Sequence, residues 1–554
     1  MLQWVKEISR RTELYLSAVS RPLSTTQLTL LALASTAIFL LLMNMEVGLY
    51  DESLMMQGAV QIGSGDVPHR DFFFTYGPMQ LWVISALFST FGKAMIVARL
   101  YDIAIRGGIV LLCGLTARRL GLRPSLVIGV MIIETFLIYA SGFYLYPVLP
   151  SILCALTSTL LLIDDGSGAE VGSSRLLIAG MLTGLTALFR YDIGFLVLAA
   201  HLVTLCLFYF YTRRSIRLLI RQIFTYGIGV SLVFIPIAIS AWAIGAVPGF
   251  VHDIVSFPPD NYARMRGLPW PMPSFALSSL PPLISYIPLF TSILGLAWLV
   301  RFRGSPRAMR DLDHRTKLGA ALLIIMTFFI VKGYIRVSLI HSLLALIPAI
   351  VLLVFLVSRK KLGFIWVFSV AVLALAALLI SLNAISVLRL EAGRGFQGLL
   401  PARIAGNAPA AMQRRRCDTP PTLGLGIVDD DTYLAACYIA SHTSADEEIY
   451  VGAGRHDKLF VSNVALYYVS DRRPATHWYH LEPGLQTQAD IQRRMIDDLI
   501  KSKVRLIAID SRFDDVNEPN DSARSSGAHL LDNFIGNHYS NVARFGSITI
   551  LARR

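Results

Sequence analysis

The sequence predicts a polytopic α-helical membrane protein that carries a soluble α/β domain at its C-terminal end. Of the 554 residues, 54% are hydrophobic and only 16% are charged, and the mean hydropathy is +0.57. Soluble domains usually carry charge on about 25% of their residues. The apolar residues also form long blocks, and a block of about 18 residues is long enough to cross a bilayer as a helix.

The apolar blocks predict about eleven membrane-spanning helices. We expect them near residues 28–45, 98–117, 126–145, 147–164, 176–189, 194–212, 223–243, 283–300, 318–331, 338–357 and 362–386. The segment Met79–Phe91 is also apolar, but it is short and is flanked by Pro78 and Gly92. We expect it to form a helix in the interface or against the bundle, with a twelfth span as the alternative.

The distribution of basic residues predicts the orientation of the bundle. One set of connections carries 21 lysines and arginines, whereas the opposite set and its edges carry about nine. Because cytoplasmic loops are enriched in these residues, we place the N-terminal segment 1–27 in the cytoplasm and residues after 386 outside. A twelfth span would destroy this bias. The net charge of +13 then reflects topology, so we expect membrane lipids and no nucleic acid as partners.

The composition changes after the last span. Residues 387–421 are rich in Gly, Ala, Pro and Arg and are expected to be a linker. Residues 422–554 alternate between strand-like and helix-like segments, which predicts a soluble α/β domain. The expected strands are 448–451, 504–509 and 547–552, and the expected helices are 431–442 and 489–502. The sequence does not indicate what this domain does.

Polar residues in the first external loop, 46–97, form the first candidate site. Asp51 and Glu52 directly follow the first span. Two carboxylates there could bind a cation, or one could act as a general base, and the alternative is an ordinary solvated start of a loop. Further along, the same loop carries four candidate substrate contacts: His69, Arg70, Asp71 and Tyr76.

Basic residues at the outer ends of later spans form the second candidate site. Arg190 could bind a phosphate, or it could simply be neutralised by Asp192. Lys332, Arg336 and His341 have no carboxylate nearby in the sequence, which favours an anion site over cations that snorkel to the headgroups.

Three further groups of residues complete the inventory of charges near the membrane. The loop 251–273, with Arg264 and Arg266, could cover the anion site or anchor the chain at the interface. Deeper in the bundle, Asp102 and Arg106 are four residues apart and are expected to pair on one helix face. For Glu134 we expect a structural role.

The order of several short motifs resembles the membrane-embedded GT-C glycosyltransferases. The likeness is greatest to the protein mannosyltransferase and lipid A aminoarabinose transferase group, glycosyltransferase family 39. That group has an acidic pair after the first span, followed by a proline before an apolar helix. Its second span has basic residues at both ends. Its fifth span has a Gly-Leu motif that ends in a basic residue. Here these are Asp51-Glu52, Pro78, Arg99, Arg118-Arg119 and Gly184 to Arg190, together with Pro68-His69-Arg70-Asp71-Phe72.

The resemblance covers roughly residues 28–360 and implies a GT-C-like catalytic domain over residues 28–386. It implies a polyprenyl-phosphate sugar as donor, a glycan, lipid or protein as acceptor, and transfer with inversion at the outer face of a bacterial inner membrane. Asp51 would be the base, while Glu52 would matter less and hold the loop. Arg190, Lys332 and Arg336 would together neutralise the lipid phosphate, with His341 as a further donor.

One departure from that group concerns metal binding. Its members often carry another acidic residue between the third and fourth spans, whereas residues 141–150 of this chain contain none. The sequence therefore supports no metal site and indicates no cofactor besides the donor substrate, with a divalent metal as the open alternative. The alternative functions are a lipid or sugar transporter and a non-enzymatic envelope assembly protein. The sequence has no internal repeat, and its polar residues gather at one membrane face, which favours the transferase.

Overall fold

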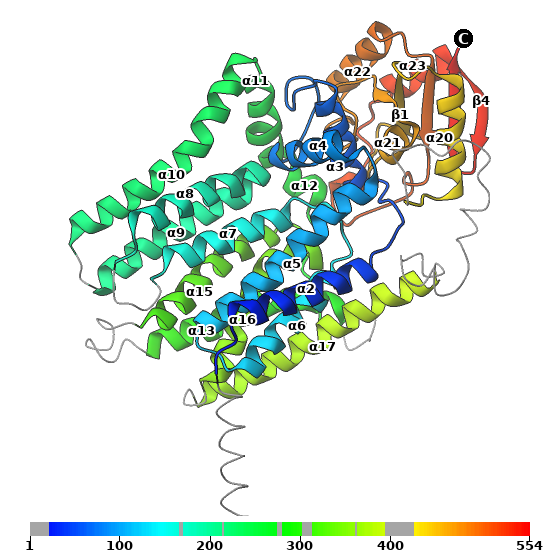
Figure 1. Ribbon diagram of the computed structural model, residues 1–554. Helices are drawn as coiled ribbons and strands as arrows, with labels where there is room; N and C mark the ends of the chain where they lie inside the picture. The colour runs from blue at the N-terminus through cyan, green and yellow to red at the C-terminus, as the bar shows by residue number, and fades with distance from the viewer. Residues whose placement is uncertain are drawn as a thin grey trace, which may run out of the picture.

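The computed structural model describes residues 21–164, 170–212, 215–273, 280–301, 313–359, 363–393 and 426–554. A helical bundle makes up most of the chain, and a smaller α/β part formed by the C-terminal residues lies against one end of it (Figure 1). The predicted linker, 387–421, lies mostly outside the described residues.

Each predicted span coincides with a helix. The helices are α2 (Thr25–Leu41), α5 (Met95–Arg119), α6 (Pro124–Ala140), α7 (Val148–Leu162), α8 (Ser173–Phe189), α9 (Tyr191–Thr212), α10 (Ile216–Ala243), α13 (Ile287–Arg301), α15 (His314–Gly333), α16 (Leu339–Ser358) and α17 (Phe364–Gly393). Among the described residues, six segments are long and apolar enough to cross a membrane: α9, α10, α15, α16, α17 and α13 with the turn before it. The exact number of spans stays a prediction.

Burial separates central from peripheral helices. The most apolar part of α16 is 89% buried, whereas that of α10 is 11% buried. Helix α10 packs closely on α8, where a side chain on Gly180 would collide with the carbonyl oxygen of Tyr226. Its other face exposes apolar side chains such as Phe224 and Trp242, as expected for a helix that faces lipid.

Two short helices lie within the loop 46–97. Helix α3 (Asp51–Gly63) packs against α4 (Met79–Phe91), and both lie between the bundle and the C-terminal part (Figure 1). The 13 residues of α4 extend about 20 Å, less than the roughly 30 Å of a hydrocarbon core. Whether α4 lies in the interface or crosses the membrane stays a prediction.

The C-terminal part is built on a five-stranded sheet with the order β2-β1-β3-β5-β4. Strand β1 is parallel to β2 and β3, whereas β5 is antiparallel to β3 and β4. The strands are β1 (Glu448–Ala453), β2 (Arg473–Pro474), β3 (Leu506–Asp510), β4 (Tyr539–Phe545) and β5 (Ile548–Arg553). The helices are α20 (Asp430–His442), α21 (Ala465–Ser470), α22 (Ala489–Lys501) and α23 (Leu530–His538). The predicted strands and helices are all present, whereas β2, β4, α21 and α23 escaped prediction.

The C-terminal part is joined to the loop 46–97 by hydrogen bonds to its backbone. Glu46 forms a bridge with Ile427, and the amide of Phe73 donates to the carbonyl of His477 over 2.9 Å. The Tyr479 hydroxyl donates to the carbonyl of Leu54 over 3.0 Å. These contacts fix the C-terminal residues directly over the start of α3, where the candidate site lies.

Candidate functional site

Asp51 is the first residue of α3, at an N-terminus where the helix dipole favours a negative charge. Its side chain is partly exposed, and within the described part of the chain no hydrogen bond or ion pair holds the carboxylate. Burial raises the pKa of Asp51 to about 6; Arg266 and Arg336 act to lower that pKa, and Glu482 acts to raise it further. A carboxylate with this pKa is charged at neutral pH and can accept a proton.

Glu52 faces the opposite way, into the bundle. Its carboxylate accepts from Arg99 over 2.6 and 2.7 Å, and both side chains are almost fully buried. Glu52 also accepts from the amide of Gly48 over 2.8 Å, and Arg99 binds the carbonyl oxygens of Asn44 and Glu46. These contacts tie the start of α3 to α5, and the role of Glu52 in holding the loop stays a prediction.

Arg190 and Lys332 meet at Asp192. Arg190 ends α8, Asp192 lies in the first turn of α9, and Lys332 lies in the last turn of α15. The Asp192 carboxylate accepts from Arg190 over 2.8 and 3.0 Å and lies 3.0 Å from the Lys332 ammonium. Two positive charges thus share one negative charge, which leaves the group with a net positive charge.

Three tyrosines surround this group. The Arg190 guanidinium lies 4.5 Å from the centre of the Tyr76 ring and 5.7 Å from that of Tyr146. Its Nη1 atom lies 3.4 Å from the Tyr146 hydroxyl, and Lys332 lies 5.2 Å from the centre of the Tyr262 ring. The charge of Asp51 acts on both Tyr76 and Tyr146, the two tyrosines whose rings lie next to Arg190.

Arg336 and Arg266 are both paired with carboxylates of the C-terminal part. Arg336 binds Glu518 over 2.6 and 2.8 Å. Arg266 binds Glu482 over 2.8 and 3.1 Å. The expectation that Lys332 and Arg336 are unpaired was therefore wrong, because Asp192 and Glu518 come from segments that are distant in the sequence.

His341 lies next to both groups. Its Nδ1 atom is 2.7 Å from the Ser338 hydroxyl, and its ring contacts that of Tyr146 edge-on at 6.3 Å. The charges of Arg190, Lys332, Arg336 and Arg266 all act on it. The predicted convergence of Arg190, Lys332 and Arg336 on one anion stays a prediction.

Four of the predicted site residues make their contacts elsewhere. His69 binds the buried Asp253 over 3.0 Å, and Arg70 pairs with Asp71 at the surface over 2.7 Å. Arg264 lies 3.4 Å from Asp521 and is largely exposed. Of the residues predicted from the loop 67–78, only Tyr76 reaches the site around Asp51 and Arg190 in the described structure.

Sequence reasoning missed Tyr146, Tyr262, Glu482 and Glu518. Tyr146 offered a signal, because it follows the third span in the loop where relatives carry an acidic residue. Glu518 lies 182 positions from its partner Arg336, and no local pattern relates the two.

Two other polar groups of the bundle were expected to be structural. Asp102 and Arg106 form the predicted pair over 2.6 Å. Glu134 is fully buried, and neither of its carboxylate oxygens has a hydrogen-bond partner among the described residues.

A group that could hold a metal ion lies within the C-terminal part. It consists of Asp457, His529 and Asp532, whose ligand atoms lie within 4.8 Å of one another. Arg455 already binds Asp457 over 2.5 and 2.8 Å, and none of the three residues lies in the site around Asp51.

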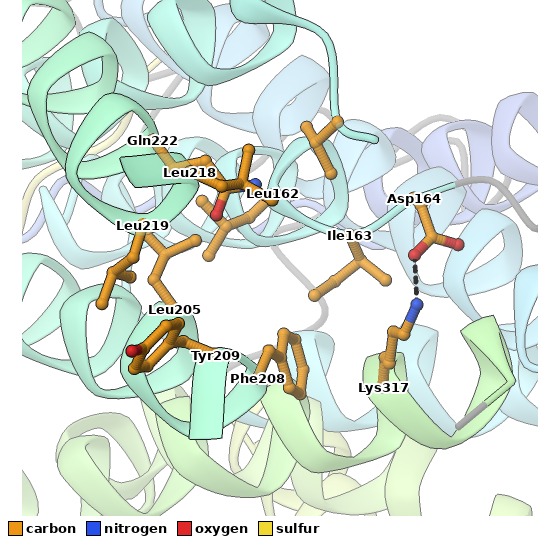
Figure 2. A pocket seen from close by; sticks show the side chains of 11 residues that line it. Leu162, Ile163, Asp164, Leu205, Phe208, Tyr209, Leu218, Leu219, Gln222 and Lys317 are labelled. Carbon is orange, nitrogen blue, oxygen red and sulfur yellow. Dashed lines mark hydrogen bonds and ion pairs between the residues drawn. The ribbon is translucent and has the colours of Figure 1, made fainter. Parts of the chain in front are cut away.

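A small pocket opens at the opposite end of the bundle (Figure 2). Leu and aromatic side chains of α7, α9 and α10 line it, and the ion pair between Asp164 and Lys317 closes one side at 2.6 Å. Lys317 and Lys332 are separated by about 22 Å along α15, so this pocket is not part of the candidate site.

Comparison with known proteins places the fold. No family model matches the chain, and no curated protein matches it in sequence. The crystal structure of ArnT from Cupriavidus metallidurans bound to undecaprenyl phosphate is similar, with a TM-score of 0.52 at 14% identity over 95% of this chain and 97% of that one. The arabinofuranosyltransferase AftD from Mycobacteria aligns with a TM-score of 0.48 at 13% identity, over 96% of this chain and 40% of that one. The chain thus resembles the GT-C glycosyltransferases in fold, as its sequence motifs predict.

Proposed function

We propose that this chain is a membrane glycosyltransferase that moves a sugar from a polyprenyl-phosphate donor to an acceptor at the outer membrane face, with inversion. The observation that carries the proposal is the free Asp51 carboxylate, which lies in one site with the Arg190–Lys332 group. The fold shared with ArnT supports it, since that protein is bound to undecaprenyl phosphate.

The proposed step needs one base and one anion site. The acceptor hydroxyl oxygen attacks the anomeric carbon of the sugar, its proton passes to Asp51, and the bond from that carbon to the phosphate oxygen breaks. The polyprenyl phosphate leaves with its negative charge. Attack from the side opposite the leaving phosphate inverts the anomeric carbon.

The Arg190–Lys332 group is suited to the leaving phosphate. Asp192 takes the Nε and Nη2 donors of Arg190, which leaves Nη1 next to the Tyr146 hydroxyl as a donor for a phosphate oxygen. Fixed cations in a water-poor site stabilise charge that develops on a leaving group. His341 and Tyr146 can donate further hydrogen bonds from the same side.

The test is a transfer assay on the purified full-length chain in lipid nanodiscs, with polyprenyl-phosphate sugars as candidate donors. Mass spectrometry of envelope glycans from a deletion strain would identify the sugar. Losing a general base typically costs about 10²–10⁴ in rate, so we expect Asp51→Asn to lose that much activity. Glu170→Gln, which alters an exposed ion pair with Arg221, is the matched control. An Asp51→Asn protein that transfers sugar at the normal rate would refute the proposal.

A further inference from the structure

Glu482 brings the C-terminal part into direct contact with the residue before the proposed base. One of its carboxylate oxygens accepts from the Tyr50 hydroxyl over 2.6 Å, and the other accepts from Arg266 over 2.8 Å. Tyr50 precedes Asp51 and stands at the start of α3. A hydrogen-bonded chain therefore runs from Arg266 through Glu482 to the backbone that carries Asp51.

This chain is largely buried and is held in place from behind. The side chains of Arg266 and Glu482 are 10% and 15% exposed. The amide of Glu482 donates to Gln486 over 2.7 Å, and the Tyr50 hydroxyl also approaches the carbonyl oxygen of Leu481 at 3.3 Å. A buried ion pair costs desolvation energy and is weak evidence for a role in stability, so its position beside Asp51 calls for a functional explanation.

We propose that Glu482 is a positioning residue of the catalytic centre, which acts on Asp51 through Tyr50 and Arg266. The C-terminal part then belongs to the transferase site itself. This inference rests on the proposed function for the role of Asp51, and it adds a residue that the helical bundle does not supply.

The charges around Asp51 give the inference a measurable consequence. Six charged or titratable side chains interact electrostatically with Asp51. They are Tyr50 at the start of α3, Tyr76 in the loop before α4, Tyr146 in the loop before α7, Arg266 in α12 (Ala263–Arg266), Arg336 in the turn after α15, and Glu482 in the C-terminal part. Glu482 and Arg266 act on the pKa of Asp51 with opposite signs, although they form one ion pair.

Two substitutions that break the same ion pair should therefore move the titration of Asp51 in opposite directions. Glu482→Gln removes a negative charge and frees Arg266, which lowers the pKa of Asp51. Arg266→Gln removes a positive charge and frees Glu482, which raises it. Adding or removing one unit charge near a partly buried carboxyl shifts the pKa of that carboxyl by about one unit.

The experiment measures carbodiimide modification of Asp51 in the purified full-length chain in nanodiscs. A water-soluble carbodiimide with an amine nucleophile reacts with the protonated carboxyl, and mass spectrometry of the peptide gives the modified fraction at each pH. We expect half-modification near pH 6 for the unchanged chain. Glu482→Gln should lower the midpoint by about one pH unit, and Arg266→Gln should raise it by about one.

Controls separate an electrostatic role from a structural one. Glu482→Asp keeps the charge and should leave the midpoint unchanged, as should Glu447→Gln, which breaks a pair with Arg505 at the edge of the C-terminal part. Loosening of the structure would move both midpoints in the same direction, towards that of a solvated carboxyl. If one variant does not fold, the other carries the test against these controls.

Midpoints that move together, or not at all, would overturn the inference. This outcome is distinct from failure of the proposed function, which would show as normal transfer by Asp51→Asn. Asp51 could be the base without any influence from Glu482, and the titration does not depend on which sugar is transferred.

Discussion

The ion pair between Glu52 and Arg99 offers a direct test of the distinction between the two adjacent carboxylates. The Arg99 side chain is fully buried and that of Glu52 is 4% exposed. Arg99 makes two hydrogen bonds to Glu52 and also binds the carbonyl oxygens of Asn44 and Glu46. We expect Glu52→Gln to destabilise the protein strongly. Asp51→Asn should not lower its stability, because burial disfavours the charged form of Asp51.

The magnitude follows from what each substitution leaves behind. Glu52→Gln leaves the Arg99 charge buried without its counter-charge, and breaking a buried pair in this way costs about 3–5 kcal/mol. Replacing both residues, Glu52 by Leu and Arg99 by Met, removes the buried charge. It also removes the hydrogen bonds from Arg99 to the Asn44 and Glu46 carbonyls and from the Gly48 amide to Glu52. At about 1 kcal/mol for each of these lost bonds, the double variant should lose about 3 kcal/mol.

The assay is denaturant-induced unfolding of the purified chain, followed by tryptophan fluorescence. Glu170→Gln breaks a solvent-exposed pair and should change the free energy of unfolding by about 0–1 kcal/mol. The reasoning is refuted if Glu52→Gln unfolds at the same denaturant concentration as the unchanged chain, or if the double variant is less stable than Glu52→Gln.

Three further predictions concern topology, donor binding and pH. Reporter fusions after Lys360 and after Arg394 should report opposite compartments, and identical results would mean that the last span is misassigned. Lys332→Ala should weaken binding of undecaprenyl phosphate about tenfold, because hydrogen bonds to charged groups contribute about 1.5–3 kcal/mol. Glu518→Gln should strengthen that binding, because it frees Arg336. Unchanged binding in both variants would contradict the proposed anion site. The initial rate of transfer should fall as the pH drops through about 6, because Asp51 must be deprotonated to accept a proton, and a rate that is flat from pH 8 to pH 5 would exclude this base.

Hydropathy predicted the helices because a helix that crosses the membrane needs about twenty mostly apolar residues. This requirement holds whichever helices it packs against. The edge strand β4 escaped prediction because its polar residues, such as Ser540 and Asn541, face solvent and break the apolar pattern. Strand β2 has only two residues, too few to carry a period.

The candidate site was predictable in its residue types more than in its pairings. Lys332 and Asp192 are about 140 residues apart, and only the packing of α9 against α15 brings them together. Asp51 and Glu52 could not be told apart from sequence position alone. Successive helical residues point about 100° apart, so the first turn of α3 directs the Glu52 carboxylate to Arg99 of α5 and the Asp51 carboxylate away from it.

The balance of charges indicates where a phosphate would bind in this site. Arg266 is balanced by Glu482 and Arg336 by Glu518, whereas Arg190 and Lys332 share Asp192 alone. Arg190 and Lys332 therefore carry the only net positive charge in this set of seven side chains, at the C-terminal ends of α8 and α15. Under the proposed function, the donor phosphate would bind there. An acceptor bound to Asp51 would lie next to Tyr50, whose hydroxyl donates to Glu482 of the C-terminal part.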